Sequence, residues 1–156
     1  MQNTKTNAMR ILDSSKLEYE VHFYESGDSI DGISVAHKLG QDVNRVFKTL
    51  VTKGKSTYFV FVIPVAEELD LKKAAKSVSE KSVEMIHVKD INKVTGYIRG
   101  GCSPVGMKKL FKTVINSTAL DFDKIIFSGG KIGAQIEMSA KKLATLIGAD
   151  FETITS

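Results

Sequence analysis

A lysine lies within a stretch of the chain that otherwise has the pattern of a buried β-strand. In VFKTLVTKG, residues 46–54, apolar side chains fall on both faces, as expected for a strand that is covered on both sides. Strand alternation places Lys48 on one face and Thr49 on the other. An ammonium group at this position either reaches water along its own stem or binds a polar group of a ligand. The strand pattern alone leaves both interpretations open.

Two glycine-rich segments offer main-chain amides that a ligand could approach. GYIRGGCSPVGMKK, residues 96–109, has four residues between Gly101 and Gly106, as a phosphate-binding P-loop does. Met107 stands where that motif needs lysine, so we exclude nucleoside triphosphate binding. The second segment is FSGGKIG, residues 127–133, at the end of an apolar strand. Each glycine pair is explained by a turn, whereas the two loops together could hold an oxyanion or a phosphate.

The sequence indicates neither a protein nucleophile nor a metal site. His22, His37 and His87 are not spaced with a serine or cysteine as a catalytic pair, and we expect surface or hydrogen-bonded roles for them. The one cysteine, Cys102, cannot form an internal disulfide and has no evident activating base, so we interpret it as a small buried residue. No cofactor is predicted.

Length and composition are those of one globular domain, which we expect to span residues 1–156. The chain carries 22 basic and 18 acidic residues, a net charge of +4. This mild excess is compatible with a polyanionic partner without requiring one. The first ten residues have no apolar core of a signal peptide, and no apolar run approaches the ~20 residues of a membrane span. We therefore expect a cytoplasmic protein without membrane contact.

Helical and strand patterns alternate irregularly along the chain. They predict an α+β domain with a curved, mixed and mostly antiparallel sheet. Predicted helix starts are Ser34, Asp70 and Ser139, and predicted helix ends are Gly40, Gly96 and Gly148. Helices are predicted for 4–15, 34–40, 70–78, 90–96 and 139–148, and strands for 19–24, 46–54, 56–64, 82–88, 113–120, 124–130 and 134–138.

Four motifs occur in an order that resembles the YbaK/EbsC family. They are VFKTL, DLKKAAK, GYIRGGCSPVGMKK and SGGKIGAQIEM, and the resemblance runs from about Tyr19 to beyond Gly148. The members of this family are free-standing relatives of the editing domain inserted in bacterial prolyl-tRNA synthetases. The resemblance implies a barrel-like sheet surrounded by helices. It also implies a hydrolase that acts in protein biosynthesis and removes cysteine from mischarged Cys-tRNA(Pro) and also from Cys-tRNA(Cys). It further implies attack by the cysteinyl thiol on its own ester, contact with the aminoacylated 3′ end of tRNA, and an association with prolyl-tRNA synthetase.

The resemblance also implies which residues form the site. Lys48 matches the family lysine that faces the aminoacyl-adenosine and is the predicted catalytic residue. Thr49 would join it only if the strand is bulged or terminates there. Arg99 either contacts a tRNA phosphate or is solvated. The predicted substrate-binding residues are Tyr24, Thr49, Gly100, Gly101, Ser103, Pro104, Ser128, Gly129, Gly130 and Gln135, the last standing where some relatives have aspartate.

Two other functions stay open at this point. One is editing of another small amino acid, such as alanine on tRNA(Pro), because the sequence does not give the size of the pocket. The other is a non-catalytic module that binds tRNA ends or a synthetase, for which the weak basic excess would suffice.

Overall fold

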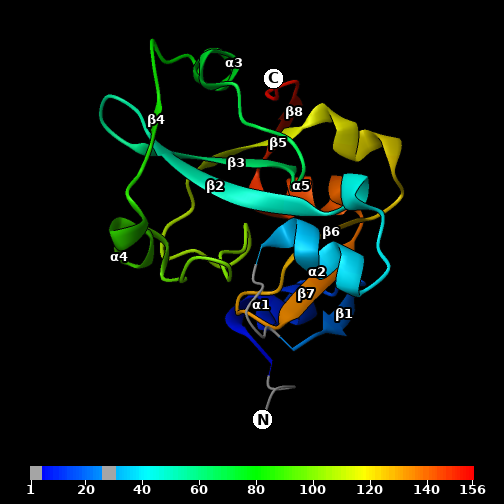
Figure 1. Cartoon of the computed structure of the whole chain (residues 1–156). Helices are drawn as coiled ribbons and strands as arrows, with labels where there is room; N and C mark the ends of the chain where they lie inside the picture. Colours follow the sequence, from blue (N-terminus) through cyan, green and yellow to red (C-terminus); the bar gives the residue numbers. More distant parts are fainter. Residues whose placement is uncertain (1–4, 26–30) are drawn as a thin grey trace.

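The computed structural model describes residues 5–25 and 31–156 (Figure 1). Short 3-10 turns at Val43–Arg45, Val88–Asp90 and Ser117–Asp121 connect its longer elements. The α-helices are α1 (Asn7–Ser14), α2 (Gly32–Lys38), α3 (Leu71–Ser77), α4 (Ile91–Thr95) and α5 (Ala140–Ile147). The strands are β1 (Glu20–Phe23), β2 (Phe47–Lys53), β3 (Tyr58–Pro64), β4 (Glu84–Met85), β5 (Lys112–Asn116), β6 (Ile125–Ser128), β7 (Ala134–Met138) and β8 (Asp150–Glu152).

The strands form two sheets. One has the order β4-β2-β3-β5-β8, in which β3 and β5 and then β5 and β8 pair in parallel, while the other strand pairs are antiparallel. The second sheet has the antiparallel order β1-β7-β6. A parallel bridge between Val46 and Ile126 links them. The predicted α+β class with mixed, mostly antiparallel strands is confirmed, although the strands are divided between two sheets and do not close into a barrel.

Strand β3 lies at the centre of the larger sheet and is buried on both faces. Its Phe61 and Ile63 pack with Ala74 and Ala75 of α3 in one apolar cluster. The alternating residues of β3, among them Val60, belong to a larger cluster formed with α1 and α5. Complete burial of one such side chain contributes roughly 1.5–3 kcal/mol to folding. No helix in the described part of the chain is long and apolar enough to span a membrane.

Most predicted helix ends are confirmed. Asp70 and Ser139 cap α3 and α5 through side-chain hydrogen bonds, and Gly96 and Gly148 end α4 and α5 in the left-handed conformation. The predicted start at Ser34 is wrong. Helix α2 begins two residues earlier, because the Asp31 carboxylate accepts hydrogen bonds from both the amide and the hydroxyl of Ser34 at 2.9 Å.

Two strand predictions differ from the structure, and one observed strand was not predicted. The strand predicted for 82–88 is reduced to β4, and the strand predicted for 113–120 ends at Asn116, where a 3-10 turn begins. Strand β8 has no counterpart among the predictions. It exists because residues 150–152 pair with β5, which is distant in sequence.

Strand β2 is paired unequally along its two edges, and this inequality positions the site. Strand β3 pairs with all seven residues from Phe47 to Lys53. Strand β4 pairs only with Thr52 and Lys53, and the chain then turns away towards α4 (Figure 1). Within the described residues, 48–50 therefore have a strand partner on one side alone.

Candidate functional site

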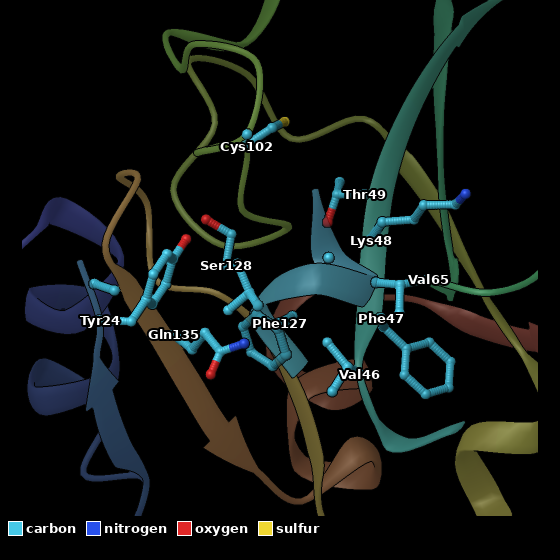
Figure 2. A pocket seen from close by; sticks show the side chains of 14 residues that line it. Tyr24, Val46, Phe47, Lys48, Thr49, Val65, Cys102, Phe127, Ser128 and Gln135 are labelled. Atoms are coloured by element: carbon cyan, nitrogen blue, oxygen red, sulfur yellow. The ribbon is translucent and has the colours of Figure 1, made fainter. Parts of the chain in front are cut away.

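A cavity of about 130 Å³ opens at the beginning of β2 (Figure 2). Its walls come from α2, from the ends of β6 and β7, from the residue after β1 and from the loop at Gly100. Six of the predicted site residues line it: Tyr24, Lys48, Thr49, Gly100, Ser128 and Gln135. Its remaining lining, which sequence reasoning did not assign to a ligand, is Gly32, Val35, Val46, Phe47, Val65, Cys102, Phe127 and Ala134.

Lys48 lines this cavity and is half-buried. In Figure 2 its side chain extends away from Tyr24 and Ser128, so the ammonium group is not directed at the two hydroxyls across the pocket. No described residue forms an ion pair or hydrogen bond with it. The lysine stem is long and flexible, so an incoming anionic or polar group can recruit the ammonium group without breaking an existing contact.

Thr49 presents a hydroxyl that lacks a partner. Its Oγ1 is buried and forms no hydrogen bond with the described residues. The register of β2 on β3 is uninterrupted, so no bulge brings Lys48 and Thr49 to one face. Both line the cavity because it opens near the first residue of the strand, Phe47. A buried hydroxyl without a partner costs about 1–3 kcal/mol, which a hydrogen bond to a ligand would offset.

The two glycine loops converge by packing against each other. A Cβ atom at Gly101 would lie only 3.0 Å from Cα of Lys131 and 3.2 Å from the Ile132 nitrogen. The amide of Gly101 donates to the carbonyl of Ile98, and the amide of Gly129 donates to that of Ala134. These amides are therefore occupied within the protein, and Gly101 and Gly129 serve the approach of the loops to each other.

Five of the predicted site residues do not line the cavity: Gly101, Ser103, Pro104, Gly129 and Gly130. Ser103 is fully buried, and its hydroxyl accepts a hydrogen bond from the amide of Val105. Pro104 lines a separate cavity of about 210 Å³. These residues shape the loops that carry Gly100 and Ser128.

Two hydroxyl groups face the cavity across from β2. Ser128 Oγ accepts a hydrogen bond from the amide of Gly130 at 3.2 Å, which leaves the Ser128 proton for a ligand. Tyr24 is fixed at the rim because its amide donates to the carbonyl of Gly133 at 2.9 Å. Figure 2 shows both hydroxyls on the side of the pocket away from Lys48.

Gln135 forms part of the cavity lining together with a residue that the sequence did not suggest. It is 5% exposed and exchanges hydrogen bonds with Gln41, at 2.7 Å and 3.2 Å between amide nitrogen and oxygen. The pair is neutral and mutually satisfied. Gln41 lies 94 residues away in the chain, and no motif in the sequence marked it as a residue of the site.

Cys102 lines the cavity but is not suited to attack an ester. Burial raises the pKa of its thiol to about 11, so the thiol is protonated at neutral pH. Among the described lining residues there is also no histidine, aspartate or glutamate. Among the described lining residues, no hydroxyl or thiol group therefore has a histidine or a carboxylate beside it.

His22 is hydrogen-bonded outside the cavity. Its Nε2 lies 2.7 Å from an oxygen of Glu137, whose other oxygen accepts from Arg45 at 2.6 Å. Burial alone would raise the pKa of Glu137, but the hydrogen bonds from His22 and Arg45 outweigh burial and lower this pKa. Glu20 offers a third possible metal-ligand atom beside those of His22 and Glu137. Arg45, however, already compensates the charge of Glu137.

Comparisons with known proteins agree with the resemblance read from the motifs. The family model described as "Aminoacyl-tRNA editing domain" matches residues 30–146. A protein of Enterococcus faecalis named "Putative Cys-tRNA(Pro)/Cys-tRNA(Cys) deacylase EbsC" is 49% identical over 154 residues, which cover 97% of this chain and 94% of that protein. A "Proline--tRNA ligase" of Fervidobacterium nodosum is 35% identical over 74 residues, 47% of this chain and 13% of the ligase.

A solved structure shares the fold. It is described as "Crystal structure of a putative trans-editing enzyme for prolyl tRNA synthetase" and superposes with a TM-score of 0.84 at 21% identity. The superposition covers 98% of this chain and 99% of that chain, so the whole described architecture has a counterpart there.

Proposed function

The chain belongs to the aminoacyl-tRNA editing domain family, and from this membership we propose that it is an aminoacyl-tRNA deacylase that acts in trans on mischarged Cys-tRNA(Pro). Cys-tRNA(Cys) is the second substrate that the name of the Enterococcus faecalis relative suggests. A synthetase pocket discriminates side chains that differ by about one methylene by only ~1–3 kcal/mol, so a second site is needed to remove such errors. We further propose that residues 1–156 act as one domain.

The observation that carries this proposal is the small cavity, whose described lining includes Lys48 but no acidic side chain. At about 130 Å³ it suits a small side chain, and its lining offers hydroxyl groups without a carboxylate or imidazole. A site that relied on a protein nucleophile would need a base beside it. A site that positions a substrate carrying its own nucleophile does not need one, since orientation alone contributes several kcal/mol.

The reaction we propose uses the substrate thiol. The cysteinyl sulfur forms a bond with the ester carbonyl carbon, and the bond between that carbon and the ribose oxygen breaks. The thiol proton ends on the departing ribose oxygen. Water then opens the resulting thiolactone and releases free cysteine. The protein contributes orientation, with Thr49 and Ser128 as hydrogen-bond donors towards the aminoacyl group.

Lys48 is the residue we propose as catalytic. Its ammonium group has no partner among the described residues and stands beside the pocket that would hold the ester. A cation there would bind the terminal phosphate or ribose and fix the ester relative to the thiol. Tyr24, Gly100 and Gln135 complete the substrate-binding wall that we propose.

A panel of aminoacyl-tRNAs tests the proposal. Purified protein is incubated with Cys-, Ala-, Ser- and Pro-tRNA(Pro), and release of each labelled amino acid is followed. We expect release of cysteine well above that of the other three. Comparable loss of alanine would point to an editor of small amino acids in general, and binding without any release would contradict the proposed activity.

We also propose an association with prolyl-tRNA synthetase as the source of tRNA selectivity. The similarity to part of a proline–tRNA ligase supports this partner. Cysteine release from Cys-tRNA(Pro) and Cys-tRNA(Cys) should be measured with and without the synthetase. An unchanged ratio of the two rates, together with no co-migration in gel filtration, would contradict the association.

A further inference from the structure

The segment that joins α2 to β2 sends two side chains to strand β7. Gln41 exchanges hydrogen bonds with Gln135 at 2.7 Å and 3.2 Å, and Arg45 donates to Glu137 at 2.6 Å. Gln135 and Glu137 are two residues apart on β7, so their side chains lie on one face of the strand. Of these four residues, only Gln135 is in the described lining of the cavity at the start of β2. The segment then continues directly into β2, so it connects two walls of that cavity.

The main chain of Gln41 is fixed by the end of α2. Gly40 adopts the left-handed conformation with φ +67°, and the amide of Gln41 donates to the carbonyl of Ala36 at 2.8 Å, as in a Schellman motif. Ala36 is fully buried and packs in one apolar cluster with Val46 and Val65, both of which line the cavity. The position of Gln41 is therefore set by the same packing that forms the cavity wall.

Gln135 lies beside the hydroxyl of Ser128. The two residues are directly opposite each other in the pairing of β6 with β7, which places their Cβ atoms about 4.5–5.5 Å apart on one face of the sheet. A side-chain amide has two N–H groups and two oxygen lone pairs. The exchange with Gln41 uses one N–H and one lone pair of Gln135, so one of each remains for a substrate group next to Ser128.

An amide at this position needs a partner to fix its orientation. The last torsion of a glutamine side chain is broad, so it does not by itself decide which way the amide faces. A carboxylate presents an oxygen in either orientation, whereas an amide presents either N–H or oxygen, so its orientation decides what a substrate meets. Both hydrogen bonds with Gln41 form only when the two amides are oriented to match, so Gln41 fixes the orientation of Gln135.

We propose that Gln41 is a positioning residue of the deacylase, which holds the Gln135 amide so that its remaining N–H and lone pair meet the aminoacyl group beside Ser128. This inference rests on the proposed function, to which the contact between Gln135 and the substrate belongs. Gln41 is not in the described lining of the cavity, so it acts on the substrate only through Gln135.

A double-mutant cycle tests whether the two glutamines act as one unit. The variants are Gln41→Leu, Gln135→Leu and the combination of both, with kcat and KM measured for Cys-tRNA(Pro). We expect each single variant to lower kcat about tenfold with KM within about twofold, because the lost contact is made to the aminoacyl group alone. The double variant should also lose about tenfold, since the second substitution removes nothing further. It replaces both polar partners, so its urea midpoint should be no lower than those of the single variants. Gln41→Glu keeps an acceptor for the Gln135 N–H and should lose only about threefold.

Arg45→Met is the matched control. It removes the neighbouring contact of the same segment, with Glu137, which is not in the described lining of the cavity. Its urea midpoint should fall while kcat stays within about twofold of the wild type. Unchanged kcat in Gln41→Leu, a loss of about a hundredfold in the double variant, or an equal loss in Arg45→Met would overturn the positioning role.

A measurement without substrate separates this inference from the activity itself. Wild-type protein that releases no cysteine would contradict the proposed function. The pair is then tested by the side-chain amide signals of Gln135 in ¹⁵N-labelled protein, which should shift in Gln41→Leu and stay unchanged in Arg45→Met. Signals that do not move in Gln41→Leu would show that Gln41 does not hold the amide and would overturn the inference whether or not the protein is active.

Discussion

The two edges of β2 differ in how completely they are paired, and the difference separates the structural role of the strand from its proposed catalytic role. Towards β3, seven consecutive residues are paired and the partner strand is buried on both faces. Towards β4, only two residues of β2 are paired, and Thr49 retains a buried hydroxyl without a described partner. The fold is thus stabilised along one edge, and polar groups remain available to a ligand along the other.

The largest effect is expected on the β3 side. Phe61 is fully buried between the sheet and α3, so Phe61→Ala should lower the free energy of unfolding by about 3–5 kcal/mol. Phe61→Leu is the control and should cost less, because it removes less volume. Urea denaturation measures both. A loss below about 1 kcal/mol for Phe61→Ala would contradict the assignment of this edge to stability.

Lys48→Ala should have the largest effect on activity. We expect cysteine release from Cys-tRNA(Pro) to fall about 100-fold or more, because a positioned charge that contacts the substrate is lost. The free energy of unfolding should change by no more than about 0.5 kcal/mol, since Lys48 has no described partner. Lys48→Arg retains the charge and should keep part of the activity. Unchanged turnover in Lys48→Ala would refute the catalytic assignment.

A pair of matched substitutions on one strand sharpens the comparison further. Thr49→Val removes the hydroxyl without a partner and should lower kcat/KM about tenfold while leaving stability unchanged or slightly raised. Thr52→Val removes a buried hydroxyl that donates to the carbonyl of Phe59 at 3.1 Å, and should cost about 1 kcal/mol of stability with little effect on activity. If both variants lost the same stability and the same activity, the two positions would not have separate roles.

The smallest effect is expected for Cys102. Since burial raises the pKa of its thiol to about 11, Cys102→Ala should keep cysteine release within about twofold of the wild type. The thiolate fraction rises with pH up to that pKa, so alkylation by iodoacetamide should be slow at neutral pH and accelerate steadily into the alkaline range. Rapid alkylation at pH 7, or loss of activity in Cys102→Ala, would point to a reactive cysteine instead.

The sequence predicted features that are determined locally. The caps at Asp70 and Ser139 and the glycine ends at Gly96 and Gly148 are formed by residues close in the chain, and the structure confirms them. The start of α2 was misplaced because both Asp31 and Ser34 are good caps, and the sequence does not show which one accepts the hydrogen bond.

Features that depend on contacts between residues far apart in the chain could not be predicted from local sequence patterns. Gln41 meets Gln135 across 94 residues, and β8 becomes a strand only by pairing with β5. The two glycine loops were expected to hold a ligand together, but Gly101 lets one loop approach the other, a role that a sequence pattern cannot distinguish from ligand contact. The six predicted residues that line the cavity were found through the family motif rather than through periodicity.

The most direct test of the account compares two substrates that differ in one atom. Cys-tRNA(Pro) and Ser-tRNA(Pro) are incubated with the wild-type protein under single-turnover conditions, and the rates of amino acid release are measured. If the substrate thiol is the attacking group, the cysteinyl ester should be cleaved about 100-fold faster or more, because a thiol ionises more readily and is the stronger nucleophile. Equal rates would contradict substrate attack and indicate that an activated water performs the reaction.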